Sequence, residues 1–176
     1  MALPYARSIA EEHLYMRLHP CRCGSGESVP VSHATGRAEQ GAVDENVERC
    51  TGCGTEREFL FRIPGLVPRY DDRYGGADPS QIIDAGQWQG LAWAQIVRAM
   101  NLGDRPAEKR AHFLEAIEYL KELQKFIPAG DEAVPESAFF TERGRRIRAA
   151  AVGDPFHQFW IDMWFQIIDE QLATLP

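Results

Sequence analysis

The second half of the chain carries apolar side chains at intervals of three and four residues, the spacing that places them on one face of a helix. The pattern is strongest near the C-terminus, between Phe156 and Leu172. It predicts helices over residues 79–85, 87–100, 105–126, 137–151 and 155–174. Three of these helices begin near a proline that an aspartate precedes by one or two residues. The aspartates are Asp78, Asp104 and Asp154, and we expect them to cap the helices.

The first part of the chain has a different pattern. Residues 4–18 have a partly apolar helical face that ends before Pro20, which predicts one helix. In residues 58–63, Phe59, Phe61 and Ile63 share one face by the two-residue period, which predicts a strand, and a short alternation covers residues 28–32. The stretch 64–77 is rich in glycine, proline and aspartate, so we expect a loop there.

Composition limits the class of protein. The 176 residues are 44% hydrophobic and 26% charged, as in an ordinary globular chain of one domain, or one domain with a small module. No apolar run reaches the ~20 residues of a membrane span, and Glu11, Glu12 and His13 interrupt the N-terminus before the apolar part of a signal peptide could form. We therefore expect a cytoplasmic protein without a membrane segment. The net charge of -7 argues against general binding to nucleic acid or to anionic membranes.

Four cysteines provide the clearest chemical signal. They form two close pairs in the first third of the chain, Cys21 with Cys23 and Cys50 with Cys53. In a reducing compartment, paired cysteines indicate a metal site more strongly than disulfides. Four thiolates are the ligand set of a closed tetrahedral Zn²⁺ site, so we expect a structural zinc.

Three alternatives to this all-cysteine site remain open. His19 could supply a nitrogen ligand in place of one thiol, since it lies two residues before Cys21. The site could also have lost its metal. A redox role for Cys50 and Cys53 is disfavoured, because a redox C-x-x-C opens a helix, whereas Cys53 precedes a predicted strand.

The cysteine region resembles the zinc-ribbon superfamily, in which two knuckles hold one zinc between short strands. Cys50-Thr51-Gly52-Cys53-Gly54 matches the C-x-x-C-G knuckle, whereas the first pair is a shorter C-x-C. As a whole, the chain resembles uncharacterised bacterial proteins that join an N-terminal zinc ribbon to a C-terminal helical region. The segments that carry this resemblance are Glu12–Met16, His19–Cys21, Arg57–Phe59 and Val134–Phe140. The resemblance implies an architecture and no activity.

These observations together predict an α+β chain. Residues 1–66 would hold a helix and a small antiparallel zinc ribbon, residues 67–77 a linker, and residues 78–176 a helical bundle or helix-hairpin array.

The functional expectation is a non-enzymatic protein with a structural zinc ribbon and a helical protein-interaction domain. No sequence template for a catalytic serine, a phosphate loop, a dinucleotide site or a metalloprotease is present, which leans against an enzyme. A protein partner is expected, and the oligomeric state is left open. The four tryptophans are expected to pack in the helical core, with an exposed aromatic groove as the alternative. The alternative functions are a nucleic-acid-associated accessory or regulatory protein, and an enzyme with an unrecognised site in the helical domain.

Overall fold

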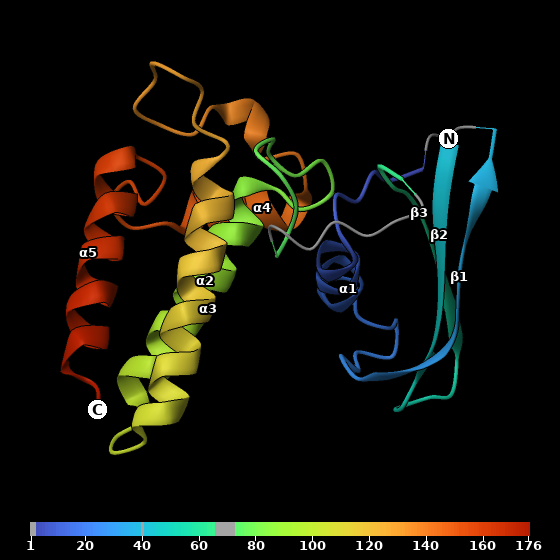
Figure 1. Ribbon diagram of the computed structural model, residues 1–176, viewed down its shortest axis with the longest axis horizontal. Helices are drawn as coiled ribbons and strands as arrows, with labels where there is room; N and C mark the ends of the chain where they lie inside the picture. Colours follow the sequence, from blue (N-terminus) through green and yellow to red (C-terminus); the bar gives the residue numbers. More distant parts are fainter. Residues whose placement is uncertain (1–2, 40, 66–72) are drawn as a thin grey trace. The chain divides into compact units, whose positions relative to one another are not determined.

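The computed structural model describes residues 3–39, 41–65 and 73–176. Within them the chain is an α+β protein with one three-stranded antiparallel sheet and five α-helices, of which α1 precedes the sheet and the others follow it (Figure 1). The predicted class and this order of elements are confirmed. The chain divides into two compact units, residues 1–82 and 83–176. Residues 67–72 of the predicted linker lie outside the described residues, so the boundaries at 66 and 77 stay a prediction.

The first unit, which we call the sheet unit, consists of α1 (Ile9–Leu18), β1 (Ser28–Ala38), β2 (Gly41–Cys50) and β3 (Glu56–Arg62). The strand order is β1-β2-β3, with β2 in the centre. Helix α1 begins later than predicted, because the Ser8 hydroxyl caps it by accepting the N–H of Glu11. The residues before it are bound to β3 instead: the N–H of Arg62 donates to the carbonyl of Pro4.

The sheet unit has few large apolar side chains in its core. Phe61 and Leu14 are fully buried, and the Tyr15 ring meets Phe61 edge-on at 5.5 Å. Strand β2 buries polar side chains at alternate positions, Asp44, Asn46 and Glu48. This arrangement reverses the usual strand pattern, in which apolar side chains face the core.

The second unit, which we call the helical unit, contains α2 (Ala85–Asn101), α3 (Pro106–Gln124), a 3₁₀ turn η1 (Glu136–Ala138), α4 (Glu142–Ala150) and α5 (Gln158–Thr174). Helices α2 and α3 run side by side in Figure 1. Large apolar side chains from all parts of the unit are fully buried. They include Ile83, Trp88, Ile96, Phe113, Tyr119, Leu123, Phe156, Ile161 and Ile168. None of the helices in the described part of the chain combines the length and apolar composition needed to cross a membrane.

The predicted helix over residues 79–85 is wrong. Asp84 is the N-cap of α2: its side chain accepts the N–H of Gln87, and the Gln87 side chain accepts the N–H of Asp84. This capping box starts the helix six residues after the Asp78 cap that the sequence suggests.

Two other predicted helices are shorter than expected. The stretch 137–151 divides into η1 and α4, because the Thr141 hydroxyl caps α4 by accepting the N–H of Gly144. Helix α5 begins after His157, whose ring nitrogen accepts the N–H of Phe159, and Asp154 is not its cap. Helix α3 begins at Pro106 as expected, but without a side-chain cap from Asp104.

Helices α2 and α4 meet through two glycines. A Cβ atom added at Gly86 would overlap the backbone of Gly144, and one added at Gly144 would overlap the Asp84 carboxylate. The second oxygen of that buried carboxylate accepts both the N–H and the hydroxyl of Thr141, each at 2.7 Å. One side chain therefore fixes the N-termini of both helices, and the glycines permit the close approach.

Candidate functional site

The four cysteines come together at one end of the sheet. Cys21 and Cys23 lie in the turn between α1 and β1, Cys50 ends β2, and Cys53 lies in the turn before β3. Their sulfur atoms all lie within 4.8 Å of one another, and the closest pairs are Cys23 with Cys50 at 3.5 Å and Cys21 with Cys53 at 3.6 Å. In a tetrahedral site with Zn–S bonds of about 2.3 Å, the sulfurs lie about 3.8 Å apart. The cluster therefore has the dimensions of a four-thiolate metal site.

The thiols are free and not joined as disulfides. A disulfide requires sulfurs about 2.05 Å apart, well below the separations seen here. Cys21 and Cys50 are buried, whereas Cys23 and Cys53 are exposed. The group could hold one metal ion between two buried and two exposed sulfurs.

Two tight turns of the backbone position the sulfurs. The N–H of Gly24 donates to the carbonyl of Cys21, and the N–H of Gly54 donates to the carbonyl of Cys50. Both glycines have positive φ, 88° and 75°, which other residues rarely adopt. The N–H of Thr51 also donates to the carbonyl of Glu27, so the two turns are tied to each other. The sequence places glycine after each cysteine pair because these turns need it.

Hydrogen bonds shift the pKa values of three of the cysteine thiols in different directions. The hydroxyl and the backbone of Thr55 lower the pKa of Cys53 to about 6. Burial opposes ionisation of Cys50, yet hydrogen bonds from the backbone and the neighbouring thiols leave its pKa lowered. The backbone at Ser25 favours the Cys23 thiolate, but the other thiols raise the pKa of Cys23 to about 11. A divalent cation is the natural counter-charge when all four sulfurs ionise together.

His19 has another role in this structure. Its Nδ1 lies 2.8 Å from the carbonyl oxygen of Tyr15, and its ring packs on the Tyr15 ring with centroids 4.0 Å apart. Among the described residues, the group of metal-ligating side chains consists of the four cysteines, without His19.

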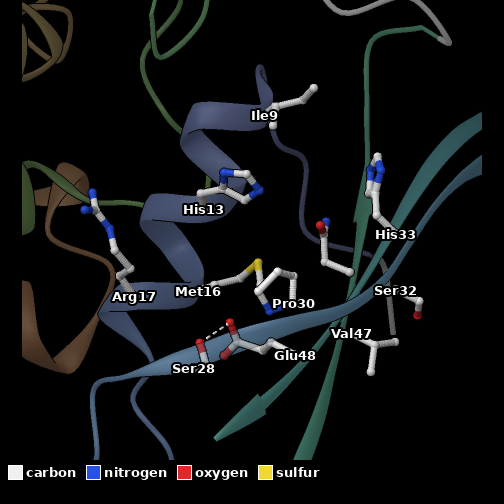
Figure 2. Close-up of a pocket in the computed structure, with 11 residues that line it drawn as sticks. Ile9, His13, Met16, Arg17, Ser28, Pro30, Ser32, His33, Val47 and Glu48 are labelled. Atoms are coloured by element: carbon white, nitrogen blue, oxygen red, sulfur yellow. Dashed lines mark hydrogen bonds between the residues drawn. The ribbon is translucent and has the colours of Figure 1, made fainter. Parts of the chain in front are cut away.

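A second feature of the sheet unit is a groove of about 520 Å³ between α1 and the strands β1 and β2. Figure 2 shows His13 and Met16 projecting toward it from α1, with Pro30 and His33 on the strand side. At its lower end, the hydroxyl of Ser28 donates to the Glu48 carboxylate at 2.7 Å.

Two residues that line this groove, Asn46 and His33, contact a pair of buried carboxyl groups, Glu12 and Asp44. Glu12 is 1% exposed; its Oε2 accepts from the Asn46 amide at 2.9 Å, and its Oε1 has no hydrogen-bond partner among the described residues. Burial, followed by the charge of Asp44, raises the pKa of Glu12 to about 8. Burial disfavours the Asp44 carboxylate, but hydrogen bonds from Thr35 and His33 keep its pKa below the usual value. Within this pair, folding favours the protonated form of Glu12 and the ionised form of Asp44.

Sequence reasoning missed this pair. Glu12 lies in a predicted helix beside Glu11, and Asp44 lies in an acidic stretch, so both read as solvent-exposed residues. The polar alternation Asp44-Glu45-Asn46-Val47-Glu48 was the available signal, but it gives no apolar face by which to recognise a strand.

The tryptophans of the helical unit divide into two classes. Trp88 is fully buried and packs against Tyr119, as a core residue should. Trp93 is 47% exposed and Trp160 is 39% exposed. Together with Trp164, these two line an open groove of about 690 Å³ between α2, α4 and α5, which we call the aromatic groove. The expectation of core packing holds for Trp88 and not for Trp93 and Trp160.

Comparison with protein families, with curated proteins and with solved structures finds no match to this chain.

Proposed function

We propose that this chain is a non-enzymatic zinc-binding protein, in which Cys21, Cys23, Cys50 and Cys53 hold one structural zinc in a zinc ribbon. The observation that carries the proposal is the gathering of all four sulfurs within 4.8 Å. Four thiolates from two glycine-bearing turns are the ligand set of structural zinc sites. The site would connect the turn before β1 to the ends of β2 and β3, so the metal would stabilise the sheet unit.

A site with four protein ligands leaves no coordination position for water or substrate, which supports a structural role over a catalytic one. The free thiols suit a reducing compartment, so we propose a cytoplasmic location.

Substitution of the metal tests this proposal. Protein refolded with Co²⁺ should show the visible absorption of tetrahedral cobalt thiolate, and Zn²⁺ should displace it at one equivalent. C50S should weaken or abolish this spectrum. R22A is the matched control, because Arg22 lies exposed between two of the cysteines and offers no ligand. A wild-type spectrum typical of octahedral Co²⁺ would overturn the four-thiolate assignment.

For the helical unit we propose a protein-interaction role. Its support is a set of large apolar side chains that are exposed: Trp93, Val97, Met100, Leu114, Phe140, Val152, Phe159 and Trp160. Three of them, Trp93, Val97 and Met100, are spaced four and three residues apart on α2 and so share one face of that helix, and exposed apolar faces are typical of interaction surfaces. Capture experiments with the full chain should return a stoichiometric protein, and the pair V97D/M100D should reduce the capture. V31D, which alters an exposed valine of the sheet unit, is the control.

The nucleic-acid alternative has weaker support. Arginines of the sheet unit have partners within the chain: Arg49 pairs with Glu56, and Arg57 pairs with Glu48. Of the four arginines of α4, Arg145 donates to backbone carbonyls, Arg148 pairs with Asp154, and Arg146 lies 3.9 Å from Glu142. Retardation of DNA or RNA in gel shifts at low salt would favour this alternative.

A further inference from the structure

We propose that the aromatic groove of the helical unit binds a small organic cation with an alkylated ammonium head. This inference goes beyond the zinc-binding role and does not depend on it, because the groove and the cysteines belong to different units. It rests on three tryptophans and one carboxylate that line the same groove.

The tryptophans come from two helices. Trp93 projects from α2, whereas Trp160 and Trp164 lie one turn apart on α5 and so share a face of that helix. Trp93 and Trp164 lie with ring centroids 5.3 Å apart and ring planes 73° apart. The groove thus has indole walls that are close to perpendicular. Aromatic rings set at such angles can present more than one π-face to a single bound group.

The charged side chain that lines the groove favours a ligand of positive charge. Among the described residues that line it, Asp154 is the only charged one. Arg148 forms an ion pair with Oδ1 of Asp154 at 3.1 Å, and the Asp154 side chain stays 46% exposed. Arg148 itself lies over the rings of Phe139 and Phe156, at 5.5 and 5.0 Å from their centroids, and does not line the groove. The Asp154 carboxylate is therefore ion-paired on one side and exposed on the other, where a ligand cation can approach it.

The other side chains that line the groove restrict the class of ligand further. Apart from Asp154 and Gln89, the lining is aromatic, aliphatic or glycine and alanine, including Met163 and Ile147. Such a surface desolvates poorly hydrated cations at low cost and attracts them to the indole faces. A hydrated metal ion or a phosphate has no ligand set here, whereas an alkylated ammonium with an apolar body fits both the walls and the carboxylate. The volume of about 690 Å³ lies within the range of small-molecule sites.

Choline is a suitable probe, and 3,3-dimethylbutan-1-ol is its uncharged control of the same shape. The readout is the set of four indole N–H signals in ¹⁵N-labelled full-length protein, recorded at constant ionic strength. Choline should shift the signals of Trp93, Trp160 and Trp164 saturably and leave the buried Trp88 in place. It should bind at least about tenfold more tightly than the alcohol, because only the cation gains from the indole faces and the carboxylate.

Substitutions inside and outside the groove test whether choline binds there. W160L and D154N should each weaken choline binding severalfold, and D154N should leave binding of the alcohol unchanged. F140L, which alters an exposed aromatic residue outside the groove, should bind choline as the wild type does. Equal binding of choline and the alcohol, or no shift with either, would overturn the proposal. Groove signals that depend on protein concentration and not on choline, with a dimer in sedimentation, would instead assign the groove to a contact between copies.

Discussion

The two units of this protein are stabilised by different means. The helical unit buries a large set of aromatic and aliphatic side chains, from Trp88 to Ile168. The sheet unit buries fewer large apolar side chains, among them Leu14, Phe61, Tyr74 and Ile82, and beside them it buries polar or charged groups on α1, on β2 and before α1. These are Arg7, Glu11, Glu12, Asp44, Asn46 and Glu48. A unit with a small apolar core commonly depends on a metal or on paired charges for its stability.

The stability of each unit can be measured separately, because all four tryptophans belong to the helical unit. Tryptophan fluorescence therefore reports unfolding of the helical unit, whereas hydrogen exchange of β2 amides reports opening of the sheet unit. The following predictions run from the largest expected effect to the smallest.

Loss of a zinc ligand should affect the sheet unit most. C50S leaves the metal one thiolate short, and we expect the sheet unit to lose several kcal/mol of stability, since metal binding and folding are coupled. Exchange of the β2 amides should accelerate by orders of magnitude, while the fluorescence melting curve changes little. An unchanged exchange rate would mean that the metal does not stabilise the sheet.

Removal of one member of a buried ion pair should have the next largest effect. Arg7 and Glu11 are both buried, and the guanidinium of Arg7 donates to the Glu11 carboxylate at 2.6 and 3.0 Å and also to the carbonyl of Asp78. R7M leaves the Glu11 charge buried, which costs about 3–5 kcal/mol in comparable cases. R17M is the control, because Arg17 is exposed. Chemical denaturation followed by β2 hydrogen exchange measures the difference; equal stability of the two variants would contradict a structural role for the pair.

In the helical unit the sensitive position is a glycine. G144A should place a methyl group against the Asp84 carboxylate and separate α4 from α2, at a cost of about 3 kcal/mol. The fluorescence melting temperature should fall, and metal content should not change. G90A is the matched control: its methyl group would meet only the tip of Ile147 at 3.0 Å, and alanine favours the helix by about 1 kcal/mol. A G144A melting curve that coincides with that of G90A would contradict the close approach.

Proton uptake by Glu12 should give the smallest effect. The raised pKa of about 8 means that folding favours the protonated form, so this contribution to stability is fully present below the unfolded value of 4.5 and is lost as pH rises toward 8. Between pH 6 and 7.5 the wild type should lose about 2 kcal/mol relative to E12Q, at about 1.4 kcal/mol per pH unit. The difference between the two proteins cancels the titration of groups that do not interact with Glu12. Parallel pH profiles would show that Glu12 is ionised in the folded protein.

The sequence predicted the parts of the fold that rest on apolar periodicity or on a special residue. The strand carrying Phe59 and Phe61 and the helices after residue 85 follow from spacing. The gathering of the cysteines follows from their pairing and from the glycines beside them. Strand β2 was missed because its buried face is polar, and its burial depends on partners in α1 and β1 that are distant in sequence.

The helix boundaries and the aromatic groove also could not be predicted from local sequence patterns. Asp84 competes with Asp78 as a cap, and the choice depends on Thr141, which lies 57 residues away. Trp88 and Trp93 lie on the same helix with similar neighbours, yet one is buried and the other lines a groove. Trp88 packs on Tyr119 of α3, whereas Trp93 meets Trp164 of α5 and stays half exposed, and no local pattern specifies where these helices lie.

Zinc content tests the central claim most directly. Protein washed with a mild chelator should be assayed for metal by elemental analysis, with thiol titration of the same sample before and after denaturation. The account predicts about one zinc per chain, with the four thiols protected until the protein unfolds. A chain without metal, with Cys21, Cys23, Cys50 and Cys53 all reactive in the folded state, would contradict it.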